Sequence, residues 1–147
     1  MTKPLLADHI MALDYGAKTV GVACTDSLGL TAQAVETIWR KRENKLRKTL
    51  ARIDQIARDR EIRLILVGLP VNMDDSEGER AGMARDFADQ VAQRTGIAVE
   101  MYDERLSTIE ADEILEKSGV PVGKRKRHLD ELSAQLILER YLEDLRQ

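Results

Sequence analysis

The chain has 147 residues, 43% of them hydrophobic, which is enough for one domain with a substantial core. Its 23 basic and 26 acidic residues give a net charge of −3, so composition alone does not indicate a nucleic-acid binder. Two histidines and one cysteine exclude a four-ligand zinc site, and Cys24, inside an apolar run, reads as a buried hydrophobe rather than a nucleophile. The sequence contains neither an 18-residue apolar run nor a signal-peptide pattern, so we expect a cytoplasmic protein with no membrane partner.

The first third of the chain has the pattern of three short strands. Apolar runs at residues 9–14 and 19–24 are joined by a turn around Gly16, and a third strand is predicted near 33–39. Because the connections are short, these strands should pair antiparallel.

Helices and strands are predicted to alternate through the middle of the chain. Residues 43–60 have apolar side chains at helical spacing, and the aliphatic run 64–67 lacks alternation, as in a strand buried on both faces. The segment Ser76–Glu79 has capping-box spacing and should open a helix that Gly96 closes. Residues 97–102 should form the next strand.

Two helices are predicted at the C-terminal end. A second capping box at Ser107–Glu110 should open the first, with Gly119 and Pro121 ending it, and the last should run from about residue 129 to 145. The order β-β-β-α-β-α-β-α-α indicates an α/β fold with a mixed five-stranded sheet and helices on both faces. No repeat, low-complexity tract or linker divides it, so residues 1–147 should form a single domain.

Acidic or polar residues follow each strand that is expected to run parallel to its neighbours. Asp14 ends the first strand, Gly68–Asn72 follows the fourth, and the fifth runs into Asp103, Glu104 and Arg105. In open α/β sheets, ligands gather at the carboxyl ends of the strands. We therefore expect these groups to converge, with Asp14, Asp103 and Glu104 as candidate catalytic residues.

Asp130 is the fourth candidate catalytic residue. On the predicted last helix it begins a stripe at helical spacing that should face the sheet, formed by Ala134, Ile137, Leu138, Tyr141 and Leu145. The alternative is that Asp130, in the first turn, stays in solvent and only complements the helix dipole.

Clustered carboxylates repel one another and are tolerated when cations neutralise them. Oxygen ligands without His or Cys suit Mg²⁺ or Mn²⁺. Two such ions can activate water and stabilise the leaving oxygen of a phosphodiester, so the sequence predicts a metal-dependent phosphodiester hydrolase. Asp103 and Glu104 point to opposite faces of an extended strand, so one should bind metal while the other pairs with an arginine.

Residues near the acids are candidates for substrate binding, and each has a simpler alternative. Arg105 either holds a phosphate or pairs with the neighbouring acids. Lys18 and Thr19, in the turn after the first strand, are placed to touch the substrate backbone, although Lys18 also reads as a solvated turn lysine. Asn72 either presents its amide to substrate or caps its own turn.

Two basic clusters interrupt the mildly acidic sequence. Residues 40–48 contain six Lys or Arg side chains, which are either phosphate-binding or simply solvated helix faces. A second cluster is predicted to form a loop next to Asp130 that contacts phosphates irrespective of sequence, and it consists of Lys124, Arg125, Lys126 and Arg127. Most of the five aromatics occupy core-like positions, so we expect recognition through basic loops, with steep salt dependence, rather than base stacking.

Four segments in this order resemble the YqgF-type family of RNase H-like nucleases, whose members have been described as Holliday junction resolvases and as pre-16S rRNA nucleases. They are Ala12–Ala23, Gly68–Asp74, Asp103–Thr108 and Asp130–Ala134. The resemblance implies an RNase H-like fold and metal-dependent cleavage of structured nucleic acid, either precursor rRNA or branched DNA. One departure is Asp75, where the family usually has a glycine, and this restricts a turn that prefers positive φ.

By the same resemblance, the carboxylates would be Asp14, Asp130 and one or both of Asp103 and Glu104, and we assign the Mg²⁺ or Mn²⁺ ligands to Asp14, Glu104 and Asp130. The most specific expectation is processing of the 5′ end of pre-16S rRNA. A junction resolvase would need a dimer, and the sequence does not indicate whether the protein is a monomer or a dimer. The other readings are a non-catalytic RNA-binding factor of ribosome assembly and a nucleotide-binding ATPase or kinase, which would need two such domains.

Overall fold

The structure is a computed structural model that describes residues 8–104, 113–119 and 122–146, without the side chains of 122–128. Its centre is a five-stranded sheet in the order β3-β2-β1-β4-β5. The strands are β1 (Ile10–Tyr15), β2 (Thr19–Thr25), β3 (Ala32–Trp39), β4 (Leu64–Leu69) and β5 (Ala98–Asp103). The helices with assigned bounds are α1 (Arg47–Asp59), α2 (Glu79–Thr95) and α4 (Val122–Arg146).

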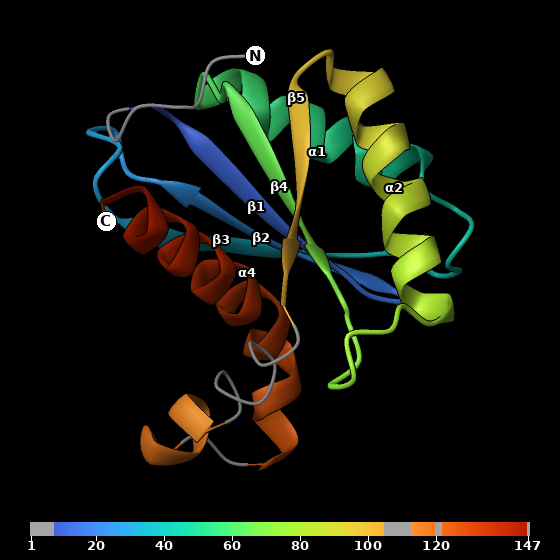
Figure 1. Ribbon diagram of the computed structural model, residues 1–147, viewed down its shortest axis with the longest axis vertical. Helices are drawn as coiled ribbons and strands as arrows, with labels where there is room; N and C mark the ends of the chain where they lie inside the picture. The colour runs from blue at the N-terminus through green and yellow to red at the C-terminus, as the bar shows by residue number, and fades with distance from the viewer. Residues whose placement is uncertain (1–7, 105–112, 120–121, 147) are drawn as a thin grey trace.

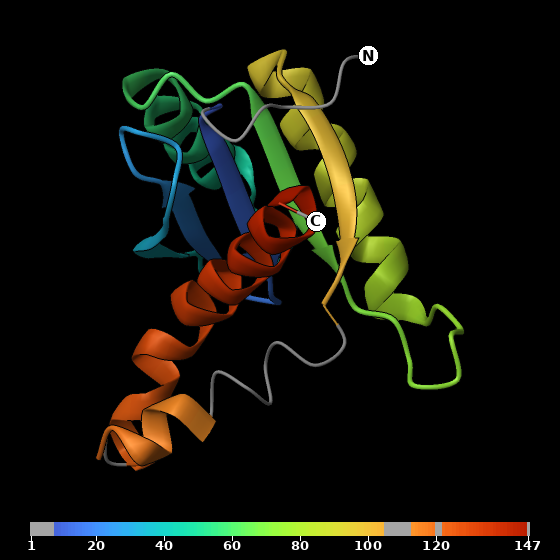
Figure 2. The ribbon, with the colours of Figure 1, turned by 60° about the vertical axis from the view of Figure 1, so that its left-hand side comes forward.

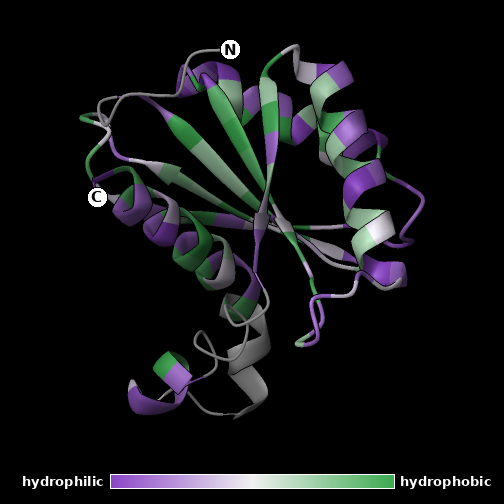
Figure 3. Ribbon diagram, viewed as in Figure 1, coloured by the Kyte–Doolittle hydropathy of each residue, from purple (hydrophilic) through white to green (hydrophobic). Residues whose placement is uncertain are grey.

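Helices cover both faces of the sheet, with α1 and α2 on one side and α4 on the other (Figure 1). The strands alternate, so Met11 and Leu13 of β1 pack toward α1 and α2, whereas Ile10 and Ala12 pack toward α4. The strands at the centre of the sheet are mostly hydrophobic, as a sheet buried on both faces requires (Figure 3). The predicted mixed sheet with helices on both faces is confirmed.

The direction of the strands determines which residues meet at one edge. β1 pairs parallel with β4, and β4 pairs parallel with β5. The first, fourth and fifth strands are therefore parallel, as predicted. β2 is antiparallel to both β1 and β3, so β3 runs in the same direction as β1. The carboxyl ends of β1, β3, β4 and β5 therefore lie at the same edge of the sheet.

The predicted starts of α1 and α2 were wrong. α1 begins at Arg47 rather than near residue 43, because the chain first forms a turn that reverses its direction after β3. α2 begins at Glu79 with Gly78 as its N-cap and no side-chain cap. The Ser76 hydroxyl instead donates to Asp74 Oδ1 at 2.5 Å, so it stabilises a turn and not the helix. The predicted end of α2 is confirmed, since Gly96 caps it with φ +72°.

Helix α4 is longer than predicted. It begins at Val122, so the basic residues 124–127 belong to a helix, and the prediction of a loop was wrong. Asp130 consequently lies more than two turns into the helix, which removes the alternative of a solvated first-turn residue. The N-terminal half of α4 projects beyond the edge of the sheet (Figure 2).

The segment before α4 is described only in part. Residues 113–117 are helical and Gly119 has φ +77°, which agrees with a helix that ends at this glycine. The predicted capping box Ser107–Glu110 lies outside the described residues. None of the helices in the described ranges is long and apolar enough to cross a membrane.

Candidate active site

Asp14 and Glu104 meet at the carboxyl edge of the sheet. Asp14 is the fifth residue of β1 and lies on the face that α4 covers, like Ile10 and Ala12. Glu104 directly follows β5, is 8% exposed, and its backbone N–H donates to the Leu69 carbonyl at 3.1 Å. Their side-chain carboxyl groups are hydrogen-bonded to each other.

Burial raises the pKa of both carboxyl groups. Desolvation raises the pKa of Asp14 from 3.8 to about 6, with a further contribution from the charge of Asp130 and an opposing one from the Glu104 hydrogen bond. Desolvation and the charge of Asp14 raise the pKa of Glu104 to about 10. A hydrogen bond between two carboxyl groups needs a proton, so this pair holds one at neutral pH.

Gly68 provides the space for this pair. The register that pairs Leu13 with Val67 brings Asp14 next to Gly68. A Cβ on Gly68 would lie 2.6 Å from the Glu104 carboxyl group and 2.9 Å from Ile137 Cδ1. Any other side chain in β4 at this position would displace Glu104, so the glycine is a steric requirement of the site.

Gly21 brings α4 and Asp130 to the site. Asp14 pairs with Gly21 across β1 and β2, and a Cβ on Gly21 would overlap the backbone carbonyl of Asp130. The backbone of α4 therefore rests directly on β2 at this point. The predicted apolar stripe of α4 is confirmed, since Ala134, Ile137 and Leu138 pack against the same face of the sheet.

Asp130 is partly buried and acts on the pair through its charge, which raises the pKa of both Asp14 and Glu104. Among the residues that the structure describes, no three His, Cys, Asp or Glu side chains lie close enough together to enclose a metal ion. Of the acids predicted to converge, Asp14 and Glu104 are therefore in contact, and Asp130 affects them through its charge. Asp103 is exposed, one residue before Glu104.

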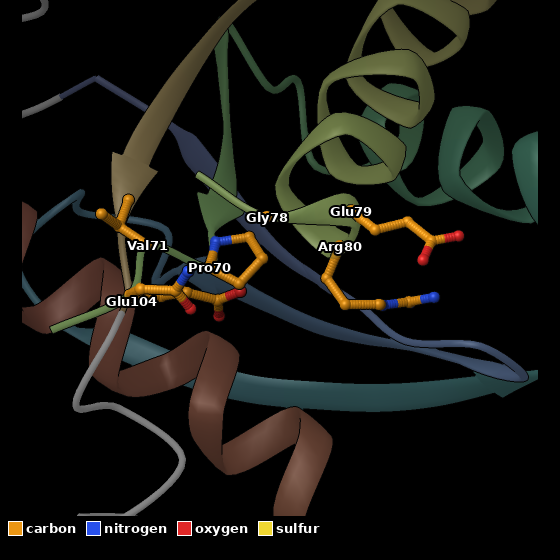
Figure 4. Close-up of a pocket in the computed structure, with 7 residues that line it drawn as sticks. Pro70, Val71, Gly78, Glu79, Arg80 and Glu104 are labelled. Carbon is orange, nitrogen blue, oxygen red and sulfur yellow. The ribbon is translucent and has the colours of Figure 1, made fainter. Parts of the chain in front are cut away.

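A cavity of ≈ 370 Å³ opens beside Glu104. It lies between the carboxyl end of β4 and the start of α2, and its lining includes Pro70, Asn72, Gly78 and Arg80 (Figure 4). Arg80 donates to Glu43 at 2.9 Å, which holds its guanidinium at the rim. The cavity gives Glu104 access to a ligand from the solvent side.

The predicted substrate-binding residues occupy different surroundings. Asn72 lines the cavity, and its amide also donates to Ser76 Oγ at 3.0 Å, so it stabilises its own turn as the simpler alternative proposed. Lys18 is exposed, whereas Thr19 is only 9% exposed, beside Gly16. Arg105 and the side chains of Lys124–Arg127 lie outside the described part of the chain.

Sequence reasoning missed three residues that build the site. Gly21 and Gly68 were noted only as members of strands or strand exits. In the structure neither position has room for a side chain, because other groups occupy the space that a Cβ would take. A glycine inside a strand is itself a signal of close approach by another backbone or group. Arg80 gave no signal, because an arginine in the first turn of a helix has no distinctive pattern.

The Asp75 turn shows the conformation expected of a glycine. Asp75 has φ +68°, and its N–H donates to the Asn72 carbonyl at 2.9 Å. Asp75 therefore adopts a backbone conformation that favours glycine, as the departure from the family pattern predicted. Cys24 is buried, and burial raises the pKa of its thiol to about 12, in agreement with a structural role.

The fold is RNase H-like, as solved structures of similar shape indicate. Thermus thermophilus RuvC in complex with a Holliday junction substrate has a TM-score of 0.58 at 15% identity, covering 92% of this chain and 94% of that one. The Fowlpox virus resolvase bound to Holliday junction DNA has a TM-score of 0.53 at 12% identity, covering 95% and 99%. At these identities the likeness establishes the fold alone.

Sequence comparison identifies the family. Residues 8–144 match RuvX, described as a Holliday junction resolvase family, and the chain belongs to this family. A "Putative pre-16S rRNA nuclease" from Lachnospira eligens is 52% identical over 135 residues, 92% of this chain and 96% of the relative. A protein of the same name from Myxococcus xanthus is 44% identical, covering 90% and 86%. The resemblance found from four sequence segments is confirmed.

Proposed function

We propose that the protein is a divalent-metal-dependent nuclease that hydrolyses phosphodiester bonds in structured nucleic acid, with the 5′ end of pre-16S rRNA as its substrate. The observation that carries this proposal is the contact between the carboxyl groups of half-buried Asp14 and buried Glu104, beside a solvent-accessible cavity. Two carboxyl groups in contact are costly for folding, and perturbed pKa values of this kind cluster at functional sites.

The residues present suit Mg²⁺ or Mn²⁺. The donor set is made only of carboxylate oxygens, and the proton that Asp14 and Glu104 share marks a place where a cation is favoured. Asp14 and Glu104 would hold the ion, with the charge of Asp130 adding to the attraction for a cation and Asp103 outside the ligand set. When bound, the metal would supply Lewis acidity and a water of lowered pKa.

The surrounding residues would bind and orient the substrate. Asn72 and Arg80 at the cavity rim offer N–H donors to phosphate oxygens. The four basic residues 124–127 lie on the part of α4 that projects past the sheet edge, where they would contact the nucleic-acid backbone. In this proposal the chain acts as one domain, residues 1–147, in the cytoplasm.

The choice of precursor rRNA follows the names of relatives that are 42–52% identical over nearly the full chain. The second candidate is resolution of four-way DNA junctions, which the description of the family favours. That reaction needs two symmetric cuts and hence a dimer. A non-catalytic RNA-binding role in ribosome assembly is the outcome if no cleavage is found.

The test is a cleavage assay with purified protein on a transcript that spans the 5′ leader of 16S rRNA and on a synthetic four-way junction. Each substrate is incubated with Mg²⁺, with Mn²⁺ and with EDTA. We expect metal-dependent cleavage of the transcript. Cleavage of the junction alone would support the second candidate, and binding of RNA without cleavage under any condition would refute the nuclease proposal.

Matched variants assign the carboxylates. Asp14→Asn and Glu104→Gln should lower the cleavage rate by at least about a hundredfold, whereas Asp103→Asn should retain most of the activity. Asp103 is adjacent in sequence but exposed, so it controls for the loss of one negative charge at this edge. Equal losses for Asp103→Asn and Glu104→Gln would contradict the assignment of Glu104 as the ligand.

A further inference from the structure

Trp39 is an exposed aromatic residue inside a basic surface. Trp39 is 57% exposed, and it is the exception to the expectation that most aromatic residues occupy core-like positions. With five exposed cations it lines a hollow of ≈ 760 Å³. We call this surface the Trp39 patch, and it consists of Trp39, Lys41, Arg42, Lys45, Arg47 and Lys48.

The backbone beneath the Trp39 patch is firmly held. Arg40 is only 9% exposed and points inward, where Nη2 donates to the Gly16 carbonyl at 2.6 Å and Nε donates to the Glu43 carbonyl at 3.1 Å. The Arg40 N–H also donates to the Lys18 carbonyl at 2.8 Å. These bonds fix the connection between β3 and α1 to the β1–β2 turn, so Trp39 stands on an ordered support.

The positive charge of the Trp39 patch is not neutralised locally. Glu43 is the only acid in residues 40–48, and it is engaged by the Tyr15 hydroxyl at 2.8 Å and by Arg80 at 2.9 Å. None of the five cations forms an ion pair with a carboxylate of the described residues. Figure 3 shows the connection between β3 and α1 as largely hydrophilic. A surface with this much unbalanced positive charge attracts a polyanion.

Trp39 itself shares an edge and a face of the sheet with Asp14, and the basic residues of the patch follow it in the connection to α1 and in the first turn of that helix. Trp39 ends β3, whose carboxyl end lies at the same edge as that of β1. Across β1, β2 and β3, Asp14 is aligned with Gly21 and then Thr37, and Trp39 lies two residues further along the same face. Strand spacing then puts the Cα atoms of Asp14 and Trp39 on the order of 10–15 Å apart.

We propose that the Trp39 patch binds a single-stranded segment of the nucleic acid that extends from the cleavage site, with a base stacked on the Trp39 indole and phosphates on Lys41–Lys48. The separation from Asp14 corresponds to only a few nucleotides, since an extended single strand spans more per nucleotide than the ~3.4 Å rise of a duplex strand. An exposed indole can stack only on a base whose face is free, so unpaired nucleotides fit and a duplex does not. This inference rests on the proposed nuclease function, because it extends the same site.

The test measures binding without cleavage. Fluorescence anisotropy of a labelled single-stranded RNA of about 12 nucleotides is followed in EDTA, in the Asp14→Asn background, with a duplex RNA of equal length alongside. Trp39→Ala should weaken single-strand binding about tenfold and Trp39→Phe much less, because phenylalanine keeps an aromatic face. Leu28→Ala is the matched control, since Leu28 is 66% exposed at the opposite edge of the sheet, and it should leave binding unchanged.

The single tryptophan provides a direct signal of stacking. Trp39 is the only tryptophan in the sequence, so quenching of the intrinsic fluorescence on RNA addition reports on this residue alone. Removal of one phosphate contact by Lys45→Gln should reduce the slope of log K against log salt by about 0.7. Arg60→Gln, exposed beyond the far end of α1, removes an equal charge and should leave the slope unchanged.

Two results would overturn the inference. One is that Trp39→Ala and Leu28→Ala bind single-stranded RNA with equal affinity, while RNA does not quench the tryptophan fluorescence of the unmodified chain. The other is an equal loss of duplex binding in Trp39→Ala, which would make the patch a duplex contact. Because binding is measured without metal, a protein that cleaves nothing but still shows Trp39-dependent binding would refute the nuclease proposal and support the patch.

Discussion

Gly21 and Asp130 are in direct contact, since the backbone carbonyl of Asp130 occupies the position that a Cβ on Gly21 would take. Gly21 is also the cross-strand partner of Asp14. The absence of a side chain at Gly21 therefore determines how closely α4 approaches Asp14, although the two are more than a hundred residues apart in the chain.

Gly21→Ala should separate α4 from the sheet and weaken both the fold and the site. The added methyl cannot be accommodated by a flexible side chain, because the overlapping atoms are backbone. We expect a loss of unfolding free energy of roughly 2–4 kcal/mol, measured by urea denaturation, together with loss of cleavage. Gly82→Ala is the control, as no atom lies within 4 Å of its Cβ position in α2, and it should gain up to about 1 kcal/mol. A stable, active Gly21→Ala variant would show that α4 is not held in this way.

Gly68→Ala should reduce activity more than stability. Its Cβ would lie 2.6 Å from the Glu104 carboxyl group, which can move, so the fold should lose only about 1–2 kcal/mol while the carboxyl pair is disrupted. The measurement compares the cleavage rate with the unfolding free energy. Gly78→Ala, which lines the same cavity with its nearest contact at 3.7 Å, should change the cleavage rate little. Parallel losses in both variants would instead indicate a general effect of filling the cavity.

The metal-free protein should become less stable as the pH rises. The pKa of Asp14 is raised from 3.8 to about 6 in the folded state, so the folded protein binds this proton more tightly than the unfolded chain. The unfolding free energy in EDTA should therefore fall as the pH rises from about 4 to 6, by on the order of 3 kcal/mol for Asp14 alone. The raised pKa of Glu104, about 10, should extend the decline to higher pH.

Urea denaturation at a series of pH values checks this dependence. Asp14→Asn should flatten the decline, Asp103→Asn should retain it, and Mg²⁺ should restore stability near pH 8 by mass action. If the unfolding free energy of the metal-free protein instead increased from pH 4 to 7, the raised pKa values of the pair would be contradicted.

Asp75→Gly should stabilise the turn before α2 and favour approach of the nucleic-acid backbone. Asp75 holds φ +68°, a conformation that glycine adopts without strain, so we expect a gain of about 0.5–1 kcal/mol in unfolding free energy. Removal of one negative charge beside the cavity should also tighten RNA binding. Glu61→Gly, at φ +54° after α1, is the control that should gain stability without a change in RNA affinity.

Helix boundaries were the part of the fold that local patterns predicted least well. Ser76 and Glu79 have capping-box spacing, yet Ser76 does not cap α2. Its hydroxyl donates to Asp74 and accepts from Asn72, so it is already bonded within the preceding turn. The start of α4 was placed seven residues too late, since the basic residues 124–127 carry no apolar stripe that would indicate a helix. Both errors arise where side chains have a local alternative or no core contact.

The sequence by itself determined the succession of strands and helices along the chain, which strands run parallel, and the acids at their ends. These follow from apolar runs, glycine-bearing turns and the rule that parallel strands end at one edge. It could not choose between Asp103 and Glu104, because both sit at the same exit and alternate between faces.

The tertiary structure shows that Glu104, and not Asp103, contacts Asp14. The space left by Gly68 receives the carboxyl group of Glu104, and the space left by Gly21 receives the backbone at Asp130. It also left Trp39 exposed beside the basic segment, although most aromatic residues were expected at core-like positions. Such contacts depend on which surfaces pack together across the sheet, and no local pattern in the chain encodes the space that a distant residue will fill.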